Sequence, residues 1–86
     1  MIRFTDHARR KFKVLRDLGL EVEENKVLEI VRKPSIIGRG WKNRLMATGP
    51  LNSTHVLRVI FEKQNGNITV VTFYPARRAR YESKLR

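Results

Sequence analysis

The stretch His55–Tyr81, HVLRVIFEKQNGNITVVTFYPARRARY, decides the fold predicted from this sequence. Two runs rich in Val, Ile and Phe flank Asn65-Gly66, a dipeptide typical of the two-residue type I′ turn between antiparallel strands. If these residues form that turn, Gln64 opposes Asn67 and the pairing of the two strands follows by counting outward. The sequence therefore predicts a long β-hairpin.

Counting outward from the turn divides the side chains of the hairpin between two faces. The predicted pairs are Phe61 with Val70, Val59 with Thr72 and Leu57 with Tyr74 on one face, and Arg58 with Phe73, Ile60 with Val71 and Glu62 with Thr69 on the other. Arg58 is then a single arginine within a largely apolar strand. The second strand ends at Pro75, and a basic cluster with a tyrosine follows it: Arg77, Arg78, Arg80 and Tyr81. We expect this hairpin to build an anion-binding surface suited to RNA.

The charge balance of the chain points to a polyanionic partner. Lys and Arg total 19 against 8 Asp and Glu in 86 residues, a formal net charge of +11. Such an excess repels itself in the compact state and attracts nucleic acid. The length suits one domain, residues 1–86. The chain has no cysteine, which excludes disulfides, thiol nucleophiles and cysteine-ligated metals.

Membrane association is not expected from this sequence. No apolar run approaches the roughly 20 residues that span a bilayer, and no stretch combines a long apolar face with a basic one. The first residues, MIRFTDHARR, contain no signal-peptide core before the charges begin. We therefore expect a cytoplasmic protein.

The first third of the chain predicts a strand followed by two helices. A short strand covers residues 2–5, and Thr5 or Asp6 is the expected N-cap of a helix that ends at Gly19. A second helix covers residues 22–33 and is stopped by Pro34. The two helices are expected to form an antiparallel pair. The residues predicted to face the core are Ala8, Phe12, Leu15 and Leu18 in the first helix and Val27, Ile30 and Val31 in the second.

The middle of the chain gives weaker signals. Ile36-Ile37 predicts a strand that Gly38-Arg39-Gly40 interrupts, and residues 41–48 predict another that Gly49-Pro50 ends. In that strand Lys42 and Arg44 would share one face. The predicted helices lie in the first part of the chain and most of the predicted strands in the last part. This order predicts an α+β fold, with an N-terminal strand and two helices on one face of a C-terminal antiparallel sheet. The opposite face would stay partly open.

Cofactor and metal chemistry have little support in the sequence. His7 and His55 are far apart, and no pair of carboxylates has the spacing of a two-magnesium site. No glycine-rich loop opens a helix, so no nucleotide cofactor is expected. We expect neither a metal nor a cofactor.

Among the reactions considered for this chain, phosphate chemistry that needs no metal is the one that remains. RNA can be cut by its own 2′-hydroxyl if a protein supplies position, charge and proton transfer, and arginine forks stabilise charge on phosphate oxygens. The hairpin and its exit supply Arg58, Arg77, Arg78 and Tyr81 for these roles. Structural alternatives stay open: Arg58 pairs with Glu62, the later arginines form a solvated tail, and Tyr81 packs that tail against the sheet.

The order and motifs of the chain resemble the small RelE-like toxins of type II toxin–antitoxin systems. The similarity lies in Arg58-Val59-Ile60-Phe61, the turn that follows, and Arg77-Arg78 with Tyr81. The opening TDHARR and the ending TFYPARR are closer to the BrnT-like branch and its small uncharacterised relatives. The resemblance implies a β-α-α-β-β-β fold with a basic active face.

The resemblance also implies an activity, partners and residue roles. It implies an endoribonuclease, an mRNA interferase whose substrate is RNA, including ribosome-bound mRNA, and which an antitoxin neutralises. Arg58 would contact the scissile phosphate, Arg77 or Arg78 would stabilise the transition state, and Tyr81 would assist proton transfer or stacking. The further candidates are Lys42, Arg44, Arg80 and Trp41 for RNA binding, and His7 and Glu62 as acid or base. None of these is an obvious general base.

Three functional hypotheses follow. The first is a metal-independent ribonuclease of RelE-like fold. The second is a non-catalytic RNA- or DNA-binding module on the same fold. The third is a structural interaction protein whose charge only keeps it soluble, in which case Trp41 is an interface or core residue rather than a base-stacking one.

Overall fold

One mixed five-stranded sheet and two helices make up the part of the chain that the computed structural model describes, residues 1–78. The elements are β1 (Ile2–Phe4), α1 (Asp6–Asp17), α2 (Glu24–Arg32), β2 (Ile36–Arg39), a 3₁₀ turn η1 (Trp41–Asn43), β3 (Leu45–Pro50), β4 (His55–Gln64) and β5 (Asn67–Arg77). The strand order is β1-β5-β4-β3-β2. The predicted α+β class is confirmed. Neither helix is both long and apolar enough to cross a membrane.

The sheet differs from the predicted one in two ways. Four strands follow the helices, rather than the three of the β-α-α-β-β-β order that the resemblance implies, and β2 runs through Gly38 without the expected interruption. The sheet is mixed rather than antiparallel, because β1 pairs in parallel with β5 at one edge, with Ile2 opposite Ile68. The other neighbouring strands are antiparallel. The first strand is thus held by the last one.

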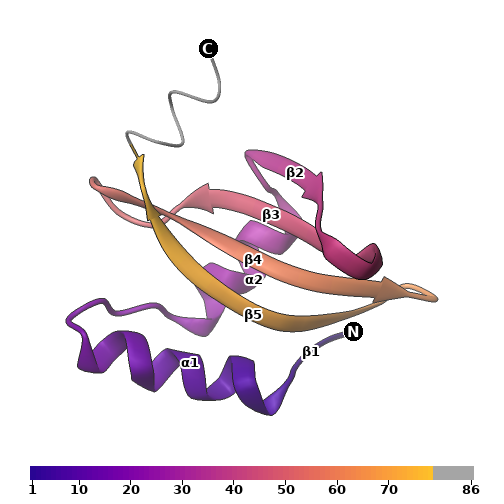
Figure 1. Cartoon of the computed structure of the whole chain (residues 1–86), viewed down its shortest axis with the longest axis horizontal. Helices are drawn as coiled ribbons and strands as arrows, with labels where there is room; N and C mark the ends of the chain where they lie inside the picture. Colours follow the sequence, from indigo (N-terminus) through magenta and orange to yellow (C-terminus); the bar gives the residue numbers. More distant parts are fainter. Residues whose placement is uncertain (79–86) are drawn as a thin grey trace.

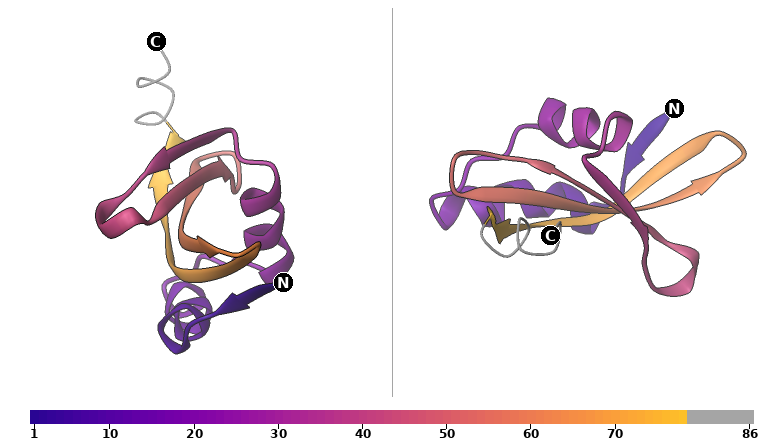
Figure 2. Two further views of the ribbon diagram at one scale, coloured as in Figure 1. Left: turned by 90° about the vertical axis from the view of Figure 1, so that its right-hand side faces the viewer. Right: turned by 90° about the horizontal axis from the view of Figure 1, so that it is seen from above.

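Each helix packs against its own part of the sheet (Figure 1). α1 lies along β5, and α2 lies across β3 and β4. The predicted antiparallel helix pair is therefore wrong: the apolar stripe of each helix is buried mainly by strands, not by the other helix. The two other views show that the sheet is strongly twisted and curved (Figure 2).

The ends of α1 follow the predicted capping signals. Thr5 is the N-cap, and its hydroxyl accepts a hydrogen bond from the Ala8 amide at 3.1 Å. At the other end Gly19 has φ +86°, and the Leu20 amide donates to the Leu15 carbonyl at 2.8 Å. Leu18 is not a core residue as predicted. It is 76% exposed, because the chain turns away immediately after it.

The second helix explains why a Gly-Pro pair lies inside a strand. The predicted residues Val27, Ile30 and Val31 are buried, although α2 begins at Glu24, two residues later than expected. Ile30 packs directly on Gly49 of β3, where a Cβ atom would lie 2.8 Å from Ile30 Cγ1. Gly49 therefore allows helix and strand to approach closely, and β3 runs on to Pro50 instead of ending before it.

The turn of the β4–β5 hairpin and its first pairs match the prediction. Asn65 and Gly66 have φ of +52° and +81°, as a type I′ turn requires. The confirmed pairs are Gln64 with Asn67, Glu62 with Thr69 and Phe61 with Val70. The local sequence therefore sets the register near the turn.

A β-bulge then shifts the register by one residue. Between the pairs Phe61–Val70 and Ile60–Thr72, residue Val71 has no Cα partner on β4. The four predicted pairs beyond this point are wrong: Ile60 faces Thr72, Val59 faces Phe73, Arg58 faces Tyr74 and Leu57 faces Pro75. Counting from the turn failed because it assumed an uninterrupted ladder.

Thr5 holds the bulge in place. Its amide donates to the Val70 carbonyl at 3.0 Å, and its hydroxyl donates to the Val71 carbonyl at 2.9 Å. The shift puts Phe73 in the core, where its ring lies 4.7 Å from that of Phe12 on α1. The residue that caps α1 thus also fixes which side chains of β5 face the helices.

Residues 41–44 do not form the predicted strand. Trp41–Asn43 is a 3₁₀ turn in which Lys42 and Asn43 have positive φ, 56° and 63°, and β3 begins only at Leu45. The expectation that Lys42 and Arg44 share a strand face is therefore wrong.

Candidate nucleic-acid interface

The face of the sheet opposite the helices carries an arginine at its centre. Leu57 and Val59 belong to the core beneath the helices, so the alternation of side chains along β4 places Arg58 between them on the other face. Its neighbours across the ladders are Thr48 on β3 and Tyr74 on β5. We call this surface the open face.

Arg58 is poorly satisfied by the protein itself. Its Nε is buried and has no hydrogen-bond partner among the described residues. Glu62, which could have paired with it, instead accepts a hydrogen bond from Arg44 Nε at 3.2 Å. A buried donor left without a partner costs about 1–3 kcal/mol. Arg58 as a whole is half-buried, so other parts of its side chain are open to an anionic ligand while Nε is not.

Tyr74 is a residue of the open face that reasoning from the sequence missed. The register counted from the turn placed it opposite Leu57, on the core side, whereas the bulge puts it directly opposite Arg58. Its hydroxyl donates to Met46 Sδ at 3.8 Å. Tyr74, Met46 and Ile60 are half-buried, so the centre of this face offers aromatic and apolar surface beside an arginine. Such a surface can stack a nucleobase.

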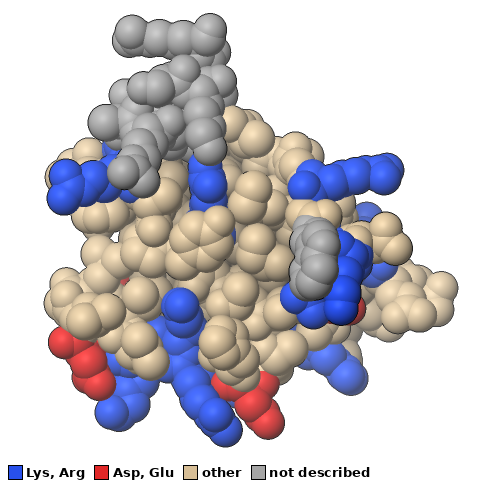
Figure 3. Space-filling model, viewed as in Figure 1, with Lys and Arg blue, Asp and Glu red and all other residues tan. Residues whose placement is uncertain are grey.

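Lys and Arg side chains lie around the edge of the face of the molecule shown in Figure 3. In that view Lys and Arg lie at the margins of a largely uncharged centre, and Asp and Glu are few and lie mainly at the lower edge. A polyanion that crosses this surface would meet positive charge on several sides.

The exit end of the hairpin, where β5 leaves the sheet, contains a hollow. It is lined by Ser53, Thr54, His55, Arg77 and Arg78. His55 and Arg77 are directly opposite each other in the β4–β5 ladder. Arg78 is held to the loop before β4, because its amide donates to the Thr54 carbonyl at 2.9 Å and its Nη1 to the Asn52 carbonyl at 3.4 Å. We call this the exit hollow.

The structure brings the predicted arginines together only in part. Arg77 and Arg78 meet at the exit hollow, together with His55, which was not among the predicted site residues. Arg58 lies three residues from His55 along β4, about 10 Å at the usual rise of a strand. Nothing in the sequence marked His55 as a site residue, because its place beside Arg77 depends on the pairing with the opposite strand.

The two predicted acid–base candidates both have polar partners. His7 Nε2 lies 3.1 Å from Thr72 Oγ1, and Glu62 pairs with Arg44. Thr72 is two residues from Tyr74 on β5, so the bond from His7 joins the start of α1 to the border of the open face. Within residues 1–78, no three His, Asp or Glu side chains gather as a metal-binding group.

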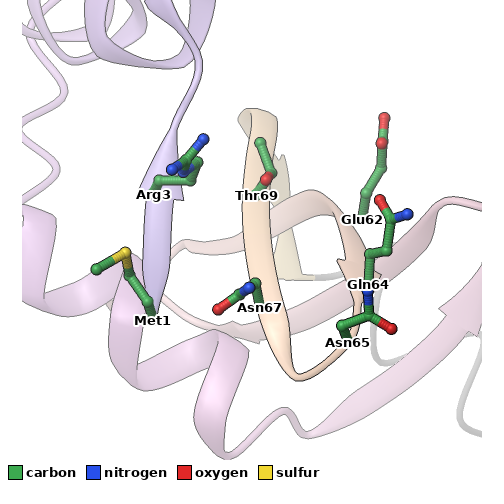
Figure 4. Close-up of a pocket in the computed structure, with 7 residues that line it drawn as sticks. All are labelled: Met1, Arg3, Glu62, Gln64, Asn65, Asn67 and Thr69. Atoms are coloured by element: carbon green, nitrogen blue, oxygen red, sulfur yellow. The ribbon is translucent and has the colours of Figure 1, made fainter.

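A second hollow lies at the turn end of the hairpin (Figure 4). Arg3 on β1, Thr69 on β5 and Glu62 on β4 extend from the three strands toward the same side. The other residues that line this turn hollow are Met1, Gln64, Asn65 and Asn67. It therefore combines amides with both signs of charge, unlike the exit hollow.

Some predicted site residues are not placed. Arg80 and Tyr81 lie outside the described residues, as does the side chain of Trp41. Lys42 lies in the 3₁₀ turn between β2 and β3.

Comparisons with protein-family models, with curated proteins and with solved structures found no match to this chain. The geometry of the two surfaces is therefore what bears on function.

Proposed function

We propose that this protein is a cytoplasmic, metal-independent endoribonuclease of the RelE-like type, which cuts RNA by attack of the 2′-hydroxyl on the adjacent phosphate. The observation that carries the proposal is Arg58, whose buried Nε has no partner among the described residues. A phosphate at the accessible part of the guanidinium would give this charge a partner, and a guanidinium stabilises the extra charge of a phosphorane-like transition state.

The surroundings of Arg58 favour RNA over a small anion. Tyr74 lies directly opposite it and offers a ring on which a base can stack. The chain carries a formal net charge of +11, which favours a polyanion. A single strand with unpaired bases meets both requirements, so single-stranded RNA is the proposed substrate.

The remaining predicted roles form part of the same proposal. Arg77 or Arg78 stabilises charge at the cleaved phosphate, and Tyr81 assists proton transfer or stacking. Lys42, Arg44, Arg80 and Trp41 are the further RNA-binding residues of this proposal. An antitoxin with an acidic or helical segment covers the basic surface and blocks it.

The test is cleavage of a 5′-labelled, mixed-sequence RNA oligonucleotide in the presence of EDTA, with and without ribosomes. Arg58→Gln should lower kcat/KM by about 10²–10³-fold, the usual effect of removing one donor to a developing anion. Arg16→Gln, the same charge change on the exposed last turn of α1, is the matched control and should stay within threefold. Equal rates for Arg58→Gln and the unchanged protein would overturn the assignment of Arg58.

A non-catalytic RNA- or DNA-binding module is the second candidate, and the half-buried ring of Tyr74 and thioether of Met46 on the open face favour it. Tyr74 and Met46 could hold bases without any bond being broken. This function predicts that affinity falls steeply with salt and that no products form. Binding without cleavage in the experiment above would favour it.

A further inference from the structure

We infer that the turn hollow is a guanine-binding pocket, which reads one base of the nucleic-acid strand held on the open face. This inference rests on the proposed function, because it takes single-stranded RNA to be bound at Arg58 and Tyr74. It adds the part of the surface that selects a sequence, and it names the base that is selected.

The turn hollow lies on the same face of the sheet as Arg58. Side chains alternate between the two faces along a strand, so Glu62 lies on the side of Arg58, whereas Phe61 lies in the core. The ladders carry this face to the neighbouring strands: Thr69 is opposite Glu62 on β5, and Arg3 is beside Thr69 on β1. A strand bound at Arg58 can therefore reach the hollow without leaving the open face.

Two opposite charges border the hollow. Arg3 and Glu62 lie on either side of the short side chain of Thr69 (Figure 4). Two strand spacings, roughly 10 Å, separate their backbones, and the two side chains do not form an ion pair with each other. The hollow has a volume of about 320 Å³, at the small end for a ligand pocket. This space suits one planar group that lies over Thr69.

Arg3 offers a complete set of hydrogen-bond donors. It forms no hydrogen bond or ion pair with another residue in the range 1–78. The fork of a guanidinium matches two adjacent acceptors, and the O6 and N7 atoms of guanine are the commonest base atoms that arginine binds in this way. The β1 side of the hollow therefore favours a base edge that carries two acceptors.

Glu62 offers an acceptor that is already held in place. Its Oε1 accepts a hydrogen bond from Arg44 Nε at 3.2 Å, which orients the carboxylate, whereas its Oε2 has no partner among the described residues. An ionised carboxylate only accepts, so this side of the hollow favours a base edge that carries N–H donors. Guanine presents the N1 and N2 donors on the edge next to O6.

The two sides together distinguish guanine from the other RNA bases. Adenine has its N6 amino group beside N7 and would turn a donor toward Arg3. Cytosine has one amino group beside two acceptors, and uracil has a single N–H between two carbonyl oxygens. Guanine alone has two acceptors on one edge and two donors on the next. Gln64 and Asn67 also line the hollow, and their amides have no partner within residues 1–78.

The spacing along β4 predicts where the selected base lies in the bound strand. Glu62 is four residues from Arg58, about 13 Å at the usual rise of a strand. Stacked nucleotides follow one another at about 3.4 Å, so at most about four of them span this distance. The guanine therefore lies within about four nucleotides of the phosphate at Arg58.

Binding without cleavage is the first test. Short oligomers of 2′-deoxyuridine lack the attacking hydroxyl, and one central position is made guanine, adenine, cytosine or uracil. Fluorescence anisotropy with the full chain should show that the guanine oligomer binds about tenfold more tightly than each of the others, the usual discrimination of a bidentate base contact. Equal affinity for the four oligomers, or a preference for another base, overturns the inference.

Two substitutions of the same charge separate base reading from general attraction. Arg3→Met removes the fork and should reduce the preference for guanine to less than about twofold. Arg16→Met makes the same change of charge on the exposed last turn of α1, so it should weaken all four oligomers alike and keep the preference. An unchanged preference in Arg3→Met contradicts the pocket.

Glu62→Gln tests the other side of the hollow. It keeps one acceptor and replaces the other with a donor, so the preference for guanine should fall about threefold. On oligomers without guanine the same change only removes a negative charge, and there the affinity should rise. An unchanged preference in this variant would overturn the role of the carboxylate and, with it, the selection of guanine.

Cleavage separates this inference from the proposed function. In a uridine RNA that contains one guanine, moved stepwise along the chain, cuts should keep one fixed spacing within about four nucleotides of the guanine. If the RNA is cut regardless of where the guanine lies, the pocket fails, although the protein remains a ribonuclease. If guanine is preferred in the deoxyuridine oligomers and no RNA is cut, the pocket stands and the ribonuclease proposal fails.

Discussion

The two ends of the β4–β5 hairpin differ in charge and in what sets their geometry. At the turn end, Asn65-Gly66 fixes the pairing locally, and the turn hollow mixes Arg3 with Glu62 and several amides. At the exit end, none of the five described residues that line the hollow is acidic. The pairing there depends on a bulge held by Thr5, whose hydroxyl bonds to a residue 66 positions away.

This difference separates local from tertiary control of the site. Without the bulge, Phe73 rather than Tyr74 would lie opposite Arg58, and the open face would lose its hydroxyl-bearing ring. The surface that we propose binds RNA is therefore set by the contacts of Thr5, the residue between β1 and α1, with the last strand. The turn, in contrast, would form in almost any context.

Thr5→Val should have the largest effect of three changes that test this difference. It removes the N-cap acceptor of α1 and the donor to the Val71 carbonyl, so we expect a loss of about 2 kcal/mol in the free energy of unfolding. Urea denaturation measures this loss. Thr5→Ser keeps the hydroxyl and should recover most of the stability.

Thr5→Val also tests whether the exit end and the turn end of the hairpin depend on different contacts. Amide chemical shifts should change from Thr72 to Arg77 and stay almost constant at Asn65 and Asn67, because only the exit end depends on Thr5. Equal shifts at both ends would show that the two registers are not independent.

Gly66→Ala tests the turn end and should have a smaller effect. An alanine at φ +81° is strained by about 1–2 kcal/mol, partly offset by the lower entropy of its unfolded chain, so we expect a loss near 1 kcal/mol. Thermal unfolding measures this loss. Gly38→Ala is the control, because a Cβ there meets no atom within 4 Å and φ is not positive. An unchanged melting temperature for Gly66→Ala would argue against a type I′ turn.

Glu62→Gln should have the smallest effect. It releases Arg44 from its ion pair, so the turn end becomes more cationic and affinity for single-stranded RNA should rise about two- to fivefold at low salt. Stability should change by less than about 1 kcal/mol, as for other exposed pairs. Fluorescence anisotropy at low and high salt measures the affinity.

The control for this change is Glu29→Gln, which breaks the ion pair between Lys26 and Glu29 on α2. It makes the same change in net charge on the side of the helices. An equal gain in affinity from both variants would show that net charge matters and that the position on the sheet does not.

Features fixed by local chemistry could be predicted from the sequence. The N-cap at Thr5, the glycine after α1 and the Asn65-Gly66 turn all depend on a few neighbouring residues, and the structure has each of them. The buried positions of α2 follow from helical spacing alone. Arg58 was singled out because a charge within an apolar strand is unusual at any register.

Features fixed by contacts distant in sequence could not be predicted. The bulge needs Thr5 beside β5, Gly49 belongs to a strand only because Ile30 packs on it, and Leu18 is exposed because the chain turns after it. His55 and Arg77 line one hollow only because the ladder places them opposite each other. In each case the residue type was visible and its neighbour was not.

The pairing of β1 with β5 also bears on how the chain folds. β1 has three residues, and its parallel partner is the last strand, where the Ile68 amide donates to the Met1 carbonyl. As the chain emerges from the ribosome, the first strand has nothing to pair with until residue 70 has been made. The helices must therefore wait with their apolar stripes uncovered while the hairpin forms, and closure of a loop of more than sixty residues completes the sheet. Folding should thus be slow for a protein of this size, and a chaperone that shields α1 during synthesis should raise its yield.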